Sequence, residues 1–424
     1  MFLHAIRKCQ TEKYPMISTI REAADLIISG RGITKNSPCT HDSVWKTICL
    51  SLTDGATWVR MNAFSSKAYA GPTEIEVSYF IAIRAAAYEG NVPLLETLLD
   101  QQPEACSVGS TDLDHPILVA ARRGNLGAVE VLAERPPGIG FENVRDCYER
   151  TALHLAAESG CLRLFNFCAH RLGISLLAED AFQTTPLDIA VSLEQMSIIQ
   201  NVCTEHNEAY GKSLLMDSHS VFEEEEVVDE ISVMKKAAAL DGQTAVLECI
   251  FTHATDIVQN MAHIDAVYVA VENSHMDVLR MIMHDCIMPD PFRFAEAGLA
   301  GLLQSVRCEN MEAFEFFVTI HVQRDLYGFK DGEDVGTLQM FFGKGIDAVI
   351  KHLANHPELE GSALLHKGLR ILVNRGRKDL VEVLLAKPAV DINRRDRYGK
   401  TVLTIAKQSS LSMAEFLISK GAHE

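Results

Sequence analysis

The feature that most constrains this chain is a short pattern that returns at nearly constant spacing. Two alanines, two further residues and a glycine end a helical stretch at Gly90, Gly124 and Gly160, and Glu194 occupies the glycine position one step later. The steps are 34, 36 and 34 residues. A period of this length is typical of helical repeat units, each of which buries its apolar face only by stacking on its neighbours. The 424 residues can therefore form one continuous body without a single compact core.

The fullest copy of the unit runs from Arg145 to Phe167. Asp146 is followed five residues later by Thr151, then by Ala-Leu-His-Leu-Ala-Ala and Gly160. The unit resembles the ankyrin repeat, whose consensus centres on Thr-Pro-Leu-His-x-Ala-Ala followed closely by Gly. Ala152 replaces the usual Pro, and Glu149 stands where the family prefers Gly. The units that match best are residues 146–169, 180–203 and 396–422.

The resemblance implies an all-α fold: an ankyrin-repeat solenoid of helix-turn-helix units with short β-hairpins, about ten repeats in two arrays, plus an N-terminal helical cap. Local chemistry supports each part of the unit. Thr151 and Thr185 precede helices and can cap them. The φ angle of Pro186 is already fixed near the value that the first turn of a helix needs. Paired alanines let neighbouring helices approach closely. The following glycine can end the helix in a left-handed conformation.

Four segments are predicted along the chain. Residues 1–75 form an N-terminal helical cap region, 76–206 a first array, and 231–424 a second, more degenerate array. Between the arrays, residues 207–230 contain the run Glu223-Glu224-Glu225-Glu226. A like-charge run is usually solvated, which indicates an acidic linker or surface loop. The alternative is an acidic docking segment for a basic partner.

Charge is distributed unevenly. Residues 1–70 carry +4, 366–407 carry +7, 408–424 carry −1 and 71–365 carry −28, within a total of −18. So acidic a surface repels nucleic-acid backbones and anionic lipid. We therefore expect no direct nucleic-acid binding, with the C-terminal stretch as the only candidate exception.

Other features favour a protein inside the cell. No run of about 18 apolar residues predicts a membrane span, and the first eight residues lack the apolar core of a secretory signal. The 11 cysteines include no Cys-x-x-Cys pair. Scattered cysteines within helical patterns are typical of a reduced compartment. We expect a monomer that is cytoplasmic and/or nuclear and does not bind membranes.

No catalytic motif is present: the phosphate-binding loop, the nucleophile elbow and the zinc-binding His-Glu-x-x-His are all missing from the sequence. We therefore predict no catalytic residue, no metal and no cofactor. His154 is the residue most easily mistaken for a catalyst. The ankyrin resemblance implies instead that it forms hydrogen bonds within the repeat.

The same resemblance places contact residues at the hairpin tips and just before the glycines. The side chains there include aromatic residues and arginines, the types enriched where binding energy concentrates. The alternative for each is that it packs on a neighbour or is merely solvated. The candidates are Tyr88, Arg122, Arg123, Tyr148, Arg150, Glu158, Phe182, Arg397 and Tyr398.

The leading hypothesis is a non-catalytic scaffold or adaptor that binds another protein through the concave face of the solenoid. One alternative is an ankyrin-type transcriptional or signalling co-regulator, suggested by the basic stretch at residues 394–397. The other is an enzyme with an apolar substrate cavity in the second array, suggested by the Phe- and Met-rich residues 285–345. Such a stripe is more often core.

Overall fold

The computed structural model describes residues 16–32, 38–53, 74–103, 105, 114–135, 140–215, 221–255, 264–286, 291–324, 342, 346–360, 362–396 and 398–423. The chain divides into two compact units, residues 1–234 and 235–424. In the described ranges every regular element is a helix, and none of these helices is long and apolar enough to cross a bilayer.

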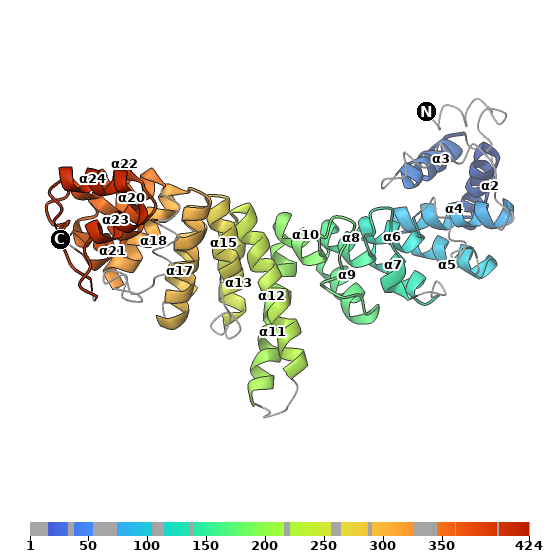
Figure 1. The fold of residues 1–424 in the computed structure, drawn as a ribbon. Helices are drawn as coiled ribbons and strands as arrows, with labels where there is room; N and C mark the ends of the chain where they lie inside the picture. Colours follow the sequence, from blue (N-terminus) through green and yellow to red (C-terminus); the bar gives the residue numbers. More distant parts are fainter. Residues whose placement is uncertain are drawn as a thin grey trace. The chain divides into compact units, whose positions relative to one another are not determined.

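Helices come in antiparallel pairs joined by a tight turn, which makes the chain a helical-repeat solenoid (Figure 1). From α4 onward nine pairs are described, together with α20 (Asp347–Asn355) and the short η3 (Phe141–Asn143) and η7 (Pro357–Leu359). In unit 1 the pairs are α4 (Glu74–Glu89) with α5 (Val92–Gln101), α6 (Pro116–Arg122) with α7 (Leu126–Ala133), α8 (Ala152–Ser159) with α9 (Leu162–Asn166) and its continuation η4 (Phe167–Arg171), and α10 (Pro186–Ser192) with α11 (Met196–Leu215). They are followed by α12 (Val221–Asp241) with α13 (Thr244–His253), α15 (Ile264–Glu272) with α16 (Met276–Met281) and η5 (Ile282–Cys286), α17 (Pro291–Arg307) with α18 (Met311–Arg324), α21 (Ala363–Asn374) with α22 (Lys378–Leu385), and α23 (Val402–Ser409) with α24 (Leu411–Ser419).

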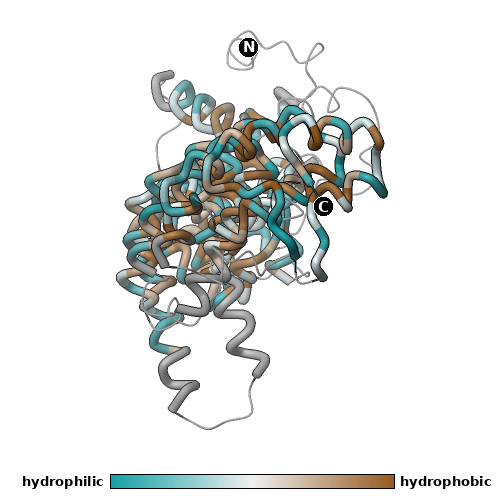
Figure 2. The backbone as a smooth tube through the Cα atoms, turned by 60° about the vertical axis from the view of Figure 1, so that its left-hand side comes forward, coloured by the Kyte–Doolittle hydropathy of each residue, from teal (hydrophilic) through white to brown (hydrophobic). Residues whose placement is uncertain are grey.

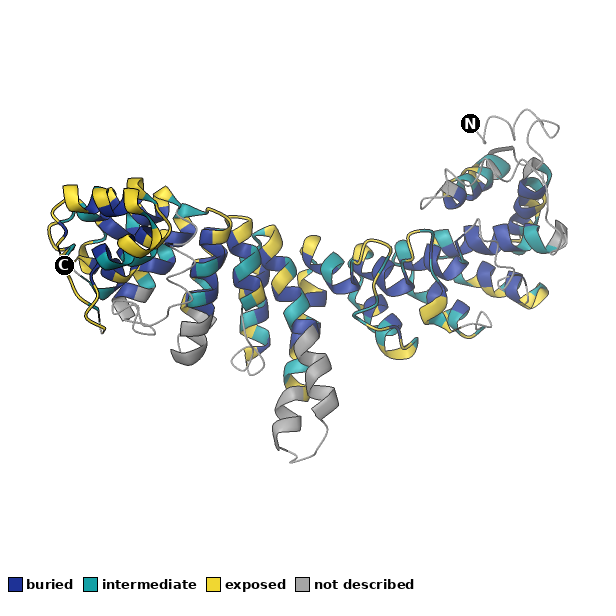
Figure 3. Ribbon diagram, viewed as in Figure 1, coloured by how far each residue is buried: buried dark blue, intermediate teal, exposed yellow. Residues whose placement is uncertain are grey.

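The core of each unit lies between successive pairs. Hydrophobic and hydrophilic residues alternate along the helices (Figure 2), and the residues that face a neighbouring pair are buried (Figure 3). In the α8–α9 pair, for example, Leu153, Leu155 and Phe165 are at most 1% exposed. The first helices α4, α6, α8 and α10 pack side by side in chain order, so small alanines in this row allow the helices to come close.

Two helices before the first repeat cover α4. They are α2 (Met16–Gly30) and α3 (Pro38–Thr53), and both pack on α4. Ser78 of α4 donates a hydrogen bond to Glu22 of α2 at 2.8 Å, and the fully buried Arg84 of α4 bonds the carbonyl of Ser51 in α3. An end repeat has no neighbour on one side, so these helices shield apolar surface that would otherwise face water.

In eight of the nine described pairs (all but α23–α24, which turns at Ser410 with φ −159°), the turn between the two helices uses one left-handed residue. It is glycine at Gly90, Gly124, Gly160, Gly242 and Gly376, but Glu194, Ser274 and Glu309 adopt the same conformation with φ of 52°, 62° and 57°. In seven of these eight turns the next residue donates its N–H to the carbonyl five positions back, as Asn125 does to Ala120 and His275 to Ala270. This satisfies a carbonyl that the helix end leaves without a partner. At Gly160, the N–H of Cys161 bonds the hydroxyl of Ser159 instead. Glu309 gives the α17–α18 pair the same kind of turn as the pairs that have glycine there.

The residue after the left-handed position also joins one repeat to the previous one. Asn125 Nδ2 donates to the carbonyls of Ala87 and Tyr88 at 2.9 and 3.1 Å. His275 and Asn310 make the equivalent bonds, to the carbonyls of Leu240 and Val271. Each bond occupies a helix-terminal carbonyl of the preceding repeat, so stacking and capping are achieved by the same side chain.

The hairpins between repeats differ from the expected β-hairpins. In the described residues they are tight turns without strands: the N–H of Asp146 bonds the carbonyl of Arg150, and Asp180 bonds Thr184 in the same way. One cross-turn bond is too few to form a ladder of paired strands. The short β-hairpins of the prediction are therefore reduced to turns here.

The acidic segment 207–230 is largely helical where the structure describes it. Residues 207–215 lie in α11 and residues 221–230 in α12. The predicted loop thus has helical secondary structure, because glutamate is a good helix former and a run of it does not by itself break a helix. His206 and Glu230 lie close together in unit 1, with Nδ1 and Oε2 2.7 Å apart.

The Phe-rich region 285–345 supplies core residues where it is described. Phe314, Phe317 and Phe342 are fully buried, and the rings of Phe316 and Phe317 meet edge to face at 5.1 Å. Gly301 makes room for Phe317, since a Cβ atom there would lie 2.1 Å from the ring. Residues 325–341 of this region lie outside the described residues.

The Asn125 bonds give a direct test of inter-repeat capping. Asn125→Ala leaves the carbonyls of Ala87 and Tyr88 without their donor, and we expect it to lower the free energy of unfolding by about 1–3 kcal/mol. Asn143→Ala is the control, because Asn143 is exposed and bonds only the adjacent Glu142 side chain. Urea unfolding followed by circular dichroism measures both; equal losses would contradict the role of Asn125.

Candidate partner-binding site

Three hairpin tips share one construction. Asp146 Oδ1 accepts the N–H groups of Tyr148 and Arg150 at 2.9 and 3.0 Å, which folds the tip into an Asx turn. Asp180 Oδ1 accepts the N–H groups of residues 182 and 184 in the same way. Asp396 Oδ1 accepts those of residues 398 and 400. The fourth tip residue is left-handed in each: Glu149 at φ 62°, Gln183 at 61° and Gly399 at 74°.

Each of these tips exposes an aromatic side chain at the same position, two residues after the aspartate. Tyr148 is 40% exposed, Phe182 72% and Tyr398 70%. Aromatic side chains so exposed on a rigid turn lose little conformational entropy when a partner covers them. The tip position is therefore the strongest candidate contact site on the described surface.

In unit 1, two tips are held together. Ala181 N–H bonds the carbonyl of Tyr148 at 2.9 Å, and Arg145 bonds the carbonyls of Glu149 and Glu179, each at 2.8 Å. The rings of Tyr148 and Phe182 lie with centroids 6.0 Å apart. Two neighbouring repeats thus present one preorganised aromatic pair.

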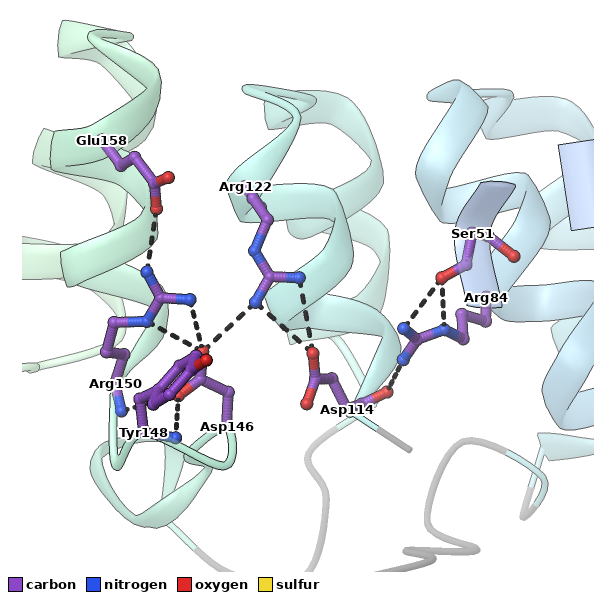
Figure 4. A network of polar contacts seen from close by, with 8 residues as sticks. All are labelled: Ser51, Arg84, Asp114, Arg122, Asp146, Tyr148, Arg150 and Glu158. Atoms are coloured by element: carbon purple, nitrogen blue, oxygen red, sulfur yellow. Dashed lines mark hydrogen bonds and ion pairs between the residues drawn. The ribbon is translucent and has the colours of Figure 1, made fainter. Parts of the chain in front are cut away.

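Behind this pair runs a ladder of buried charges (Figure 4). Arg122 lies between Asp114 at 3.4 Å and Asp146 at 3.2 Å, and Arg150 contacts the same Asp146 oxygen at 2.9 Å. Arg150 also pairs with Glu158 at 3.1 Å. The side chains of Arg122, Asp114 and Asp146 are 9%, 7% and 1% exposed.

The ladder continues toward the N-terminus. Arg84 binds the carbonyl of Asp114 with one side of its guanidinium group and the carbonyl of Ser51 with the other, at 3.0 and 2.8 Å from Nε and Nη2 (Figure 4). Buried charges are tolerated only when paired and hydrogen-bonded. The ladder therefore fixes the tips in place from inside and leaves its outer end, Arg150 and Glu158, near the surface.

His154 forms the hydrogen bonds expected for an architectural residue. Its Nδ1 accepts the N–H of Thr151 at 3.1 Å, and its Nε2 bonds the carbonyl of Thr184, in the next tip, at 3.1 Å. An amide can only donate and a carbonyl can only accept, so the ring is neutral with its proton on Nε2. Burial is the main cause that lowers the pKa of His154 below its usual value.

The predicted contact residues divide into exposed and interior groups. Tyr148, Phe182, Tyr398 and Glu158 are exposed, and Arg123 lies over the ring of the half-buried Tyr88 at 4.8 Å. Arg150 is partly exposed and lies 5.3 Å from the centre of the Tyr148 ring. Arg122 is interior, held between two carboxylates, and we leave it out of the surface proposed below. Arg397 lies outside the described residues.

Sequence reasoning missed the interior partners Arg84, Asp114 and Asp146. A signal was present for Arg84, because it lies six residues before Gly90, as His154 lies six before Gly160. Arg370 holds the same place before Gly376 and bonds the carbonyl of Lys400 at 3.2 Å. No group of His, Cys, Asp or Glu within the described ranges is arranged to hold a metal ion.

Comparison with known proteins agrees with this architecture. A family model described as ankyrin repeats in three copies matches residues 83–180, and one described as ankyrin repeats in many copies matches residues 365–418. Among solved structures, the chain is similar to the ankyrin repeat domain of human ASB11, with 13% sequence identity over 81% of this chain and 98% of that chain, at a TM-score of 0.23. No curated protein matches the sequence.

The paired helices and capped turns define a helical-repeat protein. The motif and the two family-model matches identify the kind of repeat: the chain contains ankyrin repeats, at residues 83–180 and 365–418. Ankyrin repeats are generally protein–protein interaction modules.

Two adjacent arginines test the division between interior and surface. Arg122→Ala leaves two buried carboxylates short of a cation, and we expect it to cost about 3 kcal/mol of stability. Arg123→Ala removes an exposed contact with Tyr88 and should cost less than about 1 kcal/mol. Urea unfolding of both variants measures the difference; similar losses would show that the ladder does not stabilise the repeats.

The lowered pKa of His154 predicts an acid dependence of stability. Above about pH 6.5 the ring is neutral in both states; below it the unfolded chain takes up a proton that the folded chain resists. The free energy of unfolding should thus fall from pH 7.5 to 5.5, and less steeply in His154→Gln. His423→Gln, at an exposed position, should keep the wild-type slope. Urea titrations at both pH values compare the slopes, and an unchanged slope in His154→Gln would refute the assignment.

Proposed function

We propose that this protein is a non-catalytic adaptor that binds another protein through a tip surface on unit 1. We define the tip surface as Tyr88, Arg123, Tyr148, Arg150, Glu158 and Phe182. The observation that supports it most is the contact between Tyr148 and Phe182, two exposed rings from neighbouring repeats on rigid turns. Large rings held in place before binding are where interface energy concentrates.

The character of this surface indicates how a partner is held. Arg150 is already paired with Asp146 and Glu158, so its charge is balanced within the chain. The residues 76–206 contain eight arginines, no lysine and 18 acidic residues. The partner therefore buries apolar surface on the two rings while its rim carries positive charge.

The proposed adaptor works inside the cell, in the cytoplasm and/or the nucleus. The cysteines whose side chains are described form no disulfide, and burial raises the pKa of Cys49 to about 11 and of Cys168 to about 12. Thiols with such pKa values are inert packing groups, which suits a reducing compartment.

The test compares partners captured by three versions of the full chain. Tyr148→Ala/Phe182→Ala should lose its specific partners by about tenfold or more, because each ring is an anchor. The Tyr148→Phe/Phe182→Tyr variant keeps both aromatic rings and should therefore retain the specific partners. Thermal unfolding of the alanine variant should be nearly unchanged, since both side chains are exposed. Affinity capture with quantitative mass spectrometry gives the partner amounts, and an unaltered partner set in the alanine variant refutes the tip surface.

A further inference from the structure

The last two helix pairs of unit 2 carry a larger excess of positive charge than the N-terminal segment, the other basic part of the chain. Residues 366–407 contain 11 basic and four acidic residues, in a protein whose net charge is −18. The pairs are α21 with α22 and α23 with α24, and α21 packs on α23.

The four acidic residues of this segment are already engaged. Asp396 pairs with Arg370 at 2.7 Å and accepts the Lys400 amide, which lowers the pKa of its carboxyl. Asp379 pairs with Arg377 at 2.7 Å, and its pKa is lowered to about 2 by that hydrogen bond. Glu382 contacts Lys420, and Asp391 accepts the Asn393 amide.

Several cations are left without a carboxylate. Arg375, which follows α21, and Lys400, in the last hairpin tip, are exposed, and their side chains bond no other residue in the described part of the chain. Arg395 is exposed and bonds only the carbonyl of Gly399 at 3.0 Å. Arg394, also exposed, lies 3.0 Å from a nitrogen of His366. These four residues, on the ends and tips of adjacent repeats, are named the basic face.

An aromatic anchor lies within the basic face. Tyr398 is 70% exposed at the tip that also carries Lys400. It occupies the position of Tyr148 and Phe182 in unit 1, but its charged surroundings have the opposite character. Beside Tyr148, Arg150 is neutralised by two carboxylates, whereas Arg395 and Lys400, in the tip that carries Tyr398, pair with no described carboxylate.

We propose that the basic face binds a short acidic peptide segment of another protein. Its carboxylates would meet Arg375, Arg395 and Lys400, and one apolar side chain would cover Tyr398. Unpaired cations around an exposed ring are complementary to alternating acidic and apolar residues. A long polyanion is disfavoured, because residues 71–365 carry −28 and repel it, while a short peptide reaches only the basic end.

The experiment uses the full chain and two short fluorescein-labelled peptides, one of alternating Glu, Asp and Leu, the other with Gln and Asn in place of the acids. Fluorescence anisotropy should show binding of the acidic peptide, weakening between about 50 and about 200 mM salt, and none of the neutral peptide. Arg375→Ala/Lys400→Ala should weaken binding about tenfold. Tyr398→Ala should weaken it at least threefold.

The matched control is Arg163→Ala/Arg171→Ala, which removes two exposed cations from unit 1 and should change binding less than twofold. Thermal unfolding of each variant verifies that it is folded. The proposal is overturned if the wild type does not bind the acidic peptide, or if the control loses as much as the Arg375/Lys400 variant. It is also overturned if a short single-stranded RNA of equal charge displaces the peptide at lower concentration, which would assign the face to nucleic acid. A negative result with the acidic peptide does not affect the proposed tip surface on unit 1, because Arg375, Tyr398 and Lys400 lie in unit 2.

Discussion

The structure depends on one recurring hydrogen bond, from the side chain six residues before the left-handed turn to the carbonyl that precedes the next repeat's first helix. His154 makes it to Thr184, Arg84 to Asp114 and Arg370 to Lys400. Histidine and arginine differ in size and charge, yet each donates to the same backbone atom. In each case the bond joins one repeat to the next and gives a backbone carbonyl at their junction a donor, whichever side chain supplies it.

The choice of donor changes what surrounds the bond. His154 is neutral and needs no counter-charge, whereas Arg84 brings a full charge into the interior and Arg370 brings one to a partly buried position. Arg370 is balanced by Asp396, and the arginines of unit 1 join a ladder that includes Asp114 and Asp146. The aspartates that balance these charges also close the hairpin tips at residues 146 and 396, so the exposed rings owe their fixed positions to charge balance inside the array.

Much of the fold could be predicted from the sequence, because the unit is defined by local chemistry. The alanine pairs, the capping threonines and the turn position of Glu194 and Ser274 all follow from residue type and spacing. The interior could not be predicted in the same way. Pairing of Arg122 with Asp146 depends on which side chains two repeats bring together, and the sequence alone made Arg122 look like a surface contact. The helical state of residues 207–215 and 221–230 was missed because charge indicates solvation and says little about backbone conformation.

The left-handed residues that are not glycine have a consequence for how such proteins are recognised. Gly90, Gly124 and Gly160 lie within the segment that matches the ankyrin family, and Gly376 lies within the other. Between the two segments the position is glycine at Gly242, whereas Glu194, Ser274 and Glu309 occupy it in three other pairs at a conformational cost of roughly 1–2 kcal/mol each. The neighbouring hydrogen bonds hold these turns although the residue that marks them has changed. The residue at the turn can thus differ while its geometry stays the same, so a helix pair can adopt the repeat fold in a part of the chain that no family model matches.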